Sequence, residues 1–162
     1  PVKNPKRLIN AWKGIDEKLI MVGEGALKSE MQNLIENLNL SDQISLEPET
    51  NDVAALFSKA KALVIPSDRE GSPKVLFESL FCNVPVLSTK CGIMSNLLPA
   101  SSLAEVDDES FKDLLCQWVD NINGLETLQE DCFKKVKEEN LLSIQAKKVI
   151  KIYQDLFSRV SR

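Results

Sequence analysis

Short apolar runs alternate along the chain with longer segments whose apolar residues recur at helical spacing. The clearest runs are 18–22, 44–46, 62–65 and 84–88, each of strand length. The helical period is plainest between residues 27 and 39, through Leu27, Met31, Leu34, Ile35 and Leu38. Strands that alternate with helices form a mostly parallel sheet with helices on both faces. The sequence therefore predicts an α/β fold with a Rossmann-like, doubly wound parallel sheet.

The same patterns predict the bounds of each element. Strands are expected over those runs and over 102–106. Helices are expected over 5–14, over 27–39, from a cap at Asn51 to Lys59, over 73–82, from a cap at Asp108, over 125–139 and over 143–158. No internal repeat, linker or low-complexity segment interrupts the pattern. Residues 1–162 are therefore interpreted as a single domain.

Composition excludes several kinds of catalytic site. The 162 residues are 43% hydrophobic and 27% charged, as in an ordinary globular protein. The chain contains no histidine, so it cannot assemble a Ser-His-Asp triad, a Cys-His pair or a histidine-based metal site. A formal net charge of −4, with both signs interspersed, argues against a nucleic-acid-binding surface.

Cysteine usage and hydropathy indicate the compartment. The four cysteines lack the short paired spacing of a zinc site. The sequence contains neither a signal peptide nor an apolar segment long enough to span a membrane. These features are typical of a reduced, cytoplasmic protein.

Polar and glycine-rich segments follow the expected strands. They are Gly23-Glu24-Gly25 after the first strand, residues 47–50 after the second, 67–73 after the third and 89–92 after the fourth. Because right-handed crossovers bring the carboxyl ends of parallel strands to one edge of the sheet, these segments should lie together. Ligands of open α/β sheets bind at that edge, so the sequence predicts a nucleotide cleft there.

The junction from Asp68 to Glu78 carries the densest group of polar residues. Ser72 is expected to cap the following helix and Pro73 to occupy its first position, which leaves outward-pointing amides that attract phosphate. On a helical wheel the apolar residues of 75–82 spread almost all round, which is typical of a helix buried on every side. The carboxylate of Glu78 should then be walled by apolar groups and need a partner, for which Lys74 and a ligand hydroxyl are candidates.

A plainer interpretation competes with this one. Glu70 and Glu78 could both be solvated charges, or one of them could cap a neighbouring loop amide. The combination of strand, glycine turn, Ser-Pro and apolar helix favours a ligand site. The ligand-site interpretation of this junction as a whole fails if the carboxylate of Glu78 points into bulk solvent or if a cation of the same chain fills its pocket.

These residues resemble a known family. The relevant segments are Ala62 to Ser67, Glu70-Gly71-Ser72-Pro73, Val75 to Leu80, Val84 to Thr89, Cys91-Gly92, Val22 to Gly25 and Lys3-Asn4. Together they resemble the E-x7-E signature region of the family-four retaining glycosyltransferases, which have the GT-B fold. In that family the region lies in the C-terminal domain, which binds the nucleotide sugar. The resemblance extends to about Val106.

The resemblance implies roles for eleven residues. Glu70 would lie near the donor sugar as the catalytic candidate, Glu78 would hold the ribose hydroxyls and Lys3 would contact the diphosphate. The remaining donor-binding residues would be Gly23, Gly25, Glu49, Thr50, Gly71, Ser72, Lys74 and Val75. Lys3 could equally be a solvated lysine, and Gly23 and Gly25 could form a simple turn between strand and helix. The family usually has Phe-Gly where this chain has Ser72-Pro73, which leaves the sugar and the amide contacts open.

The resemblance also implies partners and context. The donor would be a UDP- or GDP-sugar, and because no Asp-x-Asp pair is placed for a metal, transfer would need neither metal nor cofactor. The chain begins at Pro1 and is expected to be excised from a longer protein, without the preceding strand and the N-terminal acceptor-binding domain. That protein would work in the cytoplasm and build bacterial surface polysaccharide or glycolipid. The full-length protein could also bind peripherally to the inner face of the membrane.

Three alternatives remain at this point. A non-catalytic nucleotide- or sugar-binding module would keep the fold without turnover. A flavodoxin-like receiver domain also alternates strands and helices, but the strand ends offer Gly23, Pro66 and Ser88 where a receiver needs acidic residues. A Rossmann dehydrogenase is disfavoured because no G-x-G-x-x-G follows a strand.

Overall fold

The computed structural model describes residues 2–139, in which strands and helices alternate as predicted. The strands are β1 (Leu19–Val22), β2 (Ile44–Glu47), β3 (Leu63–Ile65), β4 (Val86–Thr89) and β5 (Leu103–Ala104). The helices are α1 (Pro5–Ala11), α2 (Lys28–Asn37), α3 (Val53–Phe57), α4 (Lys74–Phe81), α5 (Met94–Leu97), α6 (Asp108–Val119), α7 (Ile122–Leu128) and α8 (Glu130–Glu139), with a 3₁₀ turn at Ala100–Ser102. The α/β class is confirmed.

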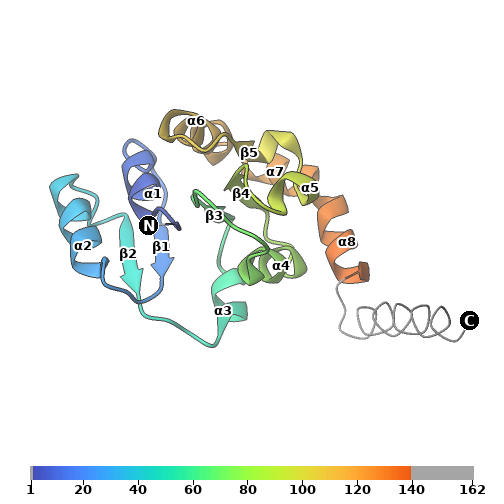
Figure 1. The fold of residues 1–162 in the computed structure, drawn as a ribbon, viewed down its shortest axis with the longest axis horizontal. Coiled ribbons are helices and arrows are strands. Elements are labelled where there is room, and N and C mark those ends of the chain that lie inside the picture. The colour runs from blue at the N-terminus through green and yellow to red at the C-terminus, as the bar shows by residue number, and fades with distance from the viewer. Residues whose placement is uncertain (1, 140–162) are drawn as a thin grey trace, which may run out of the picture.

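The strands pair only in parallel, but they form two sheets where one was expected. β1 pairs with β2, and a separate sheet has the order β3-β4-β5. Figure 1 shows β1 and β2 beside α2 on one side of the molecule and the other three strands nearer its middle. Within the described residues no backbone ladder joins β1 to β3, so the parallel strands form two separate ladders.

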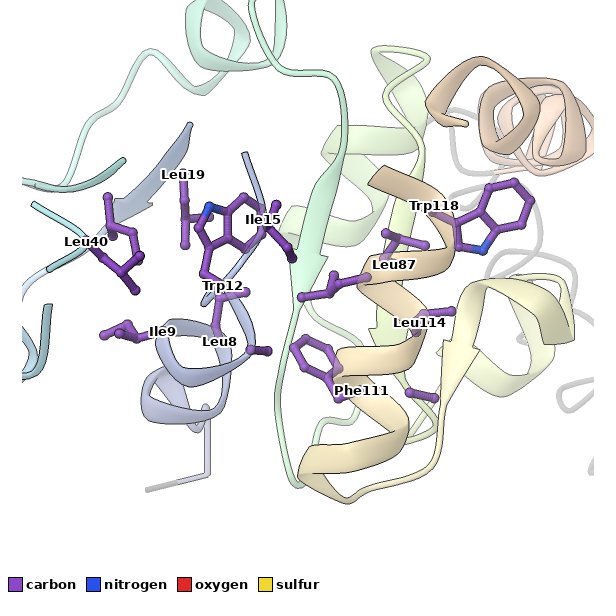
Figure 2. Packing of buried hydrophobic residues seen from close by; sticks show 14 of the residues in the cluster. Leu8, Ile9, Trp12, Ile15, Leu19, Leu40, Leu87, Phe111, Leu114 and Trp118 are labelled. Atoms are coloured by element: carbon purple, nitrogen blue, oxygen red, sulfur yellow. The ribbon is translucent and has the colours of Figure 1, made fainter. Parts of the chain in front are cut away.

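One of the two hydrophobic clusters in residues 2–139 nevertheless includes residues of both sheets. It joins α1, α2 and β1 to β4, β5 and α6, through residues that include Leu8, Trp12, Leu87 and Phe111. Figure 2 shows side chains from α1 and α6 pointing into the same layer around Leu87. Because α1 packs against both α2 and α6, side-chain packing holds the two halves together.

A second cluster packs α4 and α8 over the three-stranded sheet. Its fully buried members include Leu76, Leu80, Val86 and Met94, and α8 adds Phe133 and Val136. Gln129, at the junction of α7 and α8, is also fully buried and bonds both the N–H (2.9 Å) and the carbonyl (2.7 Å) of Val86. The side chain of Gln129 therefore anchors the first residue of β4 by two hydrogen bonds.

Several element bounds differ from the prediction. Asp52 caps α3 in place of Asn51, and Asp107 caps α6 in place of Asp108, because in each case that carboxylate reaches the amide three residues on. The helix expected over 125–139 is broken at Gln129 into α7 and α8. The strand expected over 102–106 shrinks to β5. The helix predicted over 143–158 lies outside the described residues.

Candidate functional site

Glu70 lies in the loop after β3 with its carboxylate held in place. Its side chain is only 10% exposed and forms an ion pair with Lys3 through Oε1. The hydroxyl of Ser67 donates to the same oxygen at 2.9 Å, and Ser67 is buried. Both contacts use Oε1, so Oε2 takes no part in either. The structure brings together Glu70 and Lys3, two residues that are far apart in the sequence and were predicted as site residues.

The segment after β4 supports the backbone of this loop. Ile93 donates its N–H to the carbonyl of Gly71 at 3.0 Å. Gly92 has a φ of +55°, and a Cβ at this position would stand 2.1 Å from the carbonyl oxygen of Glu70. Only a glycine fits so close to the loop in that conformation. Gly92 was part of the quoted sequence pattern but was not predicted as a site residue.

Asp68 connects the loop to the residues around α1. Asn4 donates its side-chain amide to Asp68 Oδ1 at 3.1 Å, and Arg7 Nη1 lies 2.9 Å from the same oxygen. The hydrogen bond from Asn4, with a smaller contribution from the positive charge of Arg7, lowers the pKa of Asp68 below its ordinary value. Arg7, Asn4 and Ser67 were not predicted as site residues, because their role depends on contacts between distant segments.

The α4 N-terminus differs from the prediction by one residue. Pro73 is the cap, with an extended backbone at ψ 130°, and Lys74 is the first helical residue. Ser72 lies one position too early to cap, and α4 has no side-chain cap bond. The predicted site residues here are placed differently: Ser72 and Lys74 are exposed, and Val75 is half-buried. No side chain among the described residues therefore caps the backbone N–H groups in the first turn of α4.

Glu78 is exposed, so the predicted apolar wall around its carboxylate is wrong. The helix is not buried on every side: Leu76, Ser79 and Leu80 are fully buried on one face, whereas Phe81 is 51% exposed. A helical wheel counts apolar residues but cannot tell which of them lack a neighbouring element. The argument from burial therefore fails for Glu78, and with it the sequence-based case for a ligand site that rested on this residue.

The carboxyl ends of β1 and β2 hold the other predicted residues. Gly23 donates its N–H to the carbonyl of Glu47 at 3.0 Å, and its φ of +151° suits glycine. Gly25, with a φ of +159°, accepts from the N–H of Lys28 at 3.1 Å and so starts the turn into α2. Glu49 and Thr50 are exposed, and the hydroxyl of Thr50 accepts from the N–H of Asp52.

Residues 2–139 hold neither a cluster of metal-binding side chains nor a helix that could span a membrane. No group of three or more Cys, Asp or Glu side chains within this range is arranged to hold a metal ion. Within the same residues no helix combines the length and the apolar character that crossing a membrane requires.

The sequence matches a known family model over residues 1–135, that of the group 1 glycosyl transferases. The chain belongs to this family of glycosyltransferases. A curated relative from Campylobacter jejuni, N-acetylgalactosamine-N,N'-diacetylbacillosaminyl-diphospho-undecaprenol 4-alpha-N-acetylgalactosaminyltransferase, is 32% identical over 93% of this chain. The glycosyltransferase chain spans 40% of that relative's length.

Solved glycosyltransferase structures share the fold. Sucrose-phosphate synthase from Thermosynechococcus elongatus superposes on 98% of this chain with a TM-score of 0.86 at 20% identity, and 43% of its own chain is covered. Anabaena HepE in complex with UDP-glucose superposes on 99% with a TM-score of 0.78 at 18% identity, and 46% of its chain is covered. The fold is therefore that of one half of a GT-B glycosyltransferase, as the sequence resemblance implied.

Proposed function

We propose that this chain is the donor-binding half of a retaining glycosyltransferase that takes its sugar from a nucleoside diphosphate. The observation that carries the proposal is the fixed pair of Glu70 and Lys3 in the loop that leads into α4. A carboxylate with one free oxygen can accept sugar hydroxyls, and an ammonium beside it can approach phosphate. The two groups match the sugar and the adjoining diphosphate of a nucleotide sugar.

The leaving diphosphate would be stabilised by charge and by backbone amides. In the transfer, the bond between the anomeric carbon and the diphosphate breaks and its electron pair leaves with the nucleoside diphosphate. An acceptor hydroxyl oxygen bonds that carbon, and its proton is released. Lys3 and the opening amides of α4, Lys74 and Val75, would meet the negative charge that develops. We propose that no metal and no cofactor take part.

The exposed Glu78 would bind the pentose. It lies one turn into α4, close in sequence to the amides that would meet the phosphates, and its carboxylate is open to a ligand. Gly71 and Ser72 would allow the loop backbone to approach the donor. The turn of Gly23 and Gly25 would lie beside the nucleotide, and Glu49 and Thr50 near the base.

The proposed context is a cytoplasmic enzyme of bacterial surface polysaccharide or glycolipid synthesis, working at the inner face of the membrane. Support comes from the undecaprenol-linked acceptor in the name of the Campylobacter relative. The acceptor would bind to the rest of the intact protein. Among donors a UDP-sugar is the first to test, because a structural neighbour holds UDP-glucose.

A thermal-shift panel on the intact protein tests the proposal. The ligands are UDP, GDP, UDP-glucose, UDP-N-acetylglucosamine, UDP-N-acetylgalactosamine and GDP-mannose, each with and without EDTA. Ligand at 100 times its Kd should stabilise the folded state by about 2.7 kcal/mol and raise the melting temperature visibly. The shift should survive EDTA, and Glu78→Gln should remove most of it. Glu138→Gln, on the exposed face of α8, is the matched control.

Turnover separates an enzyme from the binding module that shares its fold. The same donors are incubated with the intact protein, and release of UDP or GDP is followed. Binding without release from any donor would favour the non-catalytic module. Absence of both binding and release would contradict the proposed function.

A further inference from the structure

Arg7 is a buried cation on α1 that is paired with residues outside that helix. Its side chain is 6% exposed. Nη1 donates to the carbonyl of Pro66 at 3.0 Å and lies 2.9 Å from Asp68 Oδ1, while Nε donates to Asp108 Oδ1 at 2.7 Å. A buried charge is costly unless such partners compensate it. The position of this guanidinium is therefore closely defined.

Two of these partners flank the residue that holds Glu70. Pro66 and Asp68 are the neighbours of Ser67, whose hydroxyl donates to Glu70 Oε1. The N–H of Asp68 also donates to the carbonyl of Val2 at 2.8 Å, beside Lys3. Arg7 thus fastens the short segment that presents Ser67, and through it the carboxylate that the proposed function places against the sugar.

We propose that Arg7 is a positioning residue for sugar transfer, which acts on Glu70 through the 66–68 segment. This inference rests on the proposed function. Arg7 has no direct contact with Glu70 among the hydrogen bonds and ion pairs of the described residues. Lys3 lies two residues before the start of α1 at Pro5, so this helix helps to place the ammonium and, through Arg7, the carboxylate.

The geometry explains why this position needs arginine. The planar guanidinium reaches a backbone carbonyl and two carboxylates at once, on partners that belong to two different elements. A lysine ammonium is a single point charge on a flexible stem, so it can keep some of these contacts but cannot fix the same fork. Arg7→Lys should therefore keep part of the turnover that is lost when a neutral side chain replaces Arg7.

The test is a double-mutant cycle on the intact protein, read out as UDP or GDP release from the donor panel. Misplacing a positioned group by about 1 Å can cost about 100-fold in rate, so Arg7→Met should lower kcat by about 10- to 100-fold. The donor KM should change less than about threefold, because the nucleotide contacts stay in place. Arg7→Lys should lie between Arg7→Met and the unmodified protein. Lys6 lies on the same helix as Arg7 and forms an exposed ion pair with Glu30 of α2. Lys6→Met removes this ion pair and should leave kcat unchanged.

The cycle with Glu70→Gln separates positioning from general destabilisation. If Arg7 acts through Glu70, Arg7→Met should cost less than about twofold in kcat once Glu70 is already Gln. A merely structural role gives the same loss in both backgrounds and overturns the inference. If Arg7→Met does not fold, Asp68→Asn replaces it, since it removes the carboxylate that Arg7 and Asn4 share.

The outcomes distinguish this inference from the proposed function. A loss in Glu70→Gln together with full turnover in Arg7→Met, or in a folded Asp68→Asn, overturns the inference alone. Full turnover in Glu70→Gln, or no release from any donor by the unmodified protein, overturns both. Non-additive losses of the expected size support the positioning role.

Discussion

Gly92 lies so close to Glu70 that a Cβ on Gly92 would stand 2.1 Å from the carbonyl oxygen of Glu70 and 2.5 Å from that of Gly71. The backbone position of the loop after β3 therefore depends on the segment after β4. Both atoms in the way belong to the backbone, so no side chain can rotate to make room.

We expect Gly92→Ala to shift this loop and to reduce donor turnover more than tenfold. Its φ of +55° adds backbone strain, so the free energy of unfolding should fall by about 1–3 kcal/mol. Urea unfolding and nucleotide release measure the two effects. Gly71→Ala, whose Cβ would meet nothing within 4 Å, is the control for stability alone. A Gly92→Ala variant with normal stability and turnover would contradict the close packing.

Lys3→Met should weaken binding of nucleoside diphosphates while sparing the nucleoside. Loss of one charge-assisted hydrogen bond typically costs about 1.5–3 kcal/mol, so the Kd for UDP or GDP should rise about tenfold or more. The Kd for uridine or guanosine should stay the same. Calorimetric titration of both ligands on the intact protein measures the difference. Equal weakening of nucleoside and nucleotide would show that Lys3 serves only to hold Glu70.

Gln129→Leu should destabilise the protein although it replaces a polar side chain with an apolar one. The amide of Gln129 bonds the N–H and carbonyl of Val86 and the hydroxyl of Ser102, and all of these groups are buried. Leaving them without partners should lower the free energy of unfolding by roughly 2–4 kcal/mol. Urea unfolding measures this, with Gln117→Leu on the exposed face of α6 as the control. Equal stability of both variants would mean that water replaces the amide.

Acid should destabilise the protein through Asp68 and Asp107. The pKa of each lies below its ordinary value of 3.8, because of the amide of Asn4 for Asp68 and the N–H of Ser110 for Asp107. A carboxyl whose pKa is lower when folded contributes stability that is complete above the unfolded pKa and is lost as pH falls through the folded one. The free energy of unfolding should therefore begin to decline as the pH falls below about 5, and it should go on declining below pH 4.

The variants Asp68→Asn and Asp107→Asn identify these two groups. Each should be less stable than the unmodified protein at pH 6, and the difference should shrink as pH falls towards 3. Urea midpoints over this range measure the effect. A difference that stays constant with pH would show that neither carboxyl contributes through its charge.

Much of the site could be predicted because parallel strands bring their carboxyl ends to one edge. That rule placed the loop of Glu70 after β3 and the turn of Gly23 after β1, and the sequence pattern marked both. The caps moved by one residue, from Asn51 to Asp52, because either side chain suits a cap and only the local backbone decides.

The remaining features depend on contacts that no local pattern carries. Glu78 lies on a face of α4 that is exposed among residues 2–139, which a helical wheel cannot reveal. Arg7 looks like a surface cation of an amphipathic helix, yet it is buried against residues about 60 and 100 positions away in the sequence. The roles of residues 3 and 70 were implied by resemblance, whereas their mutual contact is a result of the fold.

The lack of a ladder between β1 and β3 has a mechanical consequence. Side chains beneath α1, together with the guanidinium of residue 7, carry the cohesion that interstrand backbone bonds supply within each sheet. To separate the Gly23 turn from the Glu70 loop, the described residues would have to give up this packing and the contacts of Arg7, but no interstrand ladder. A ligand that touches both strand ends would add a further link between them.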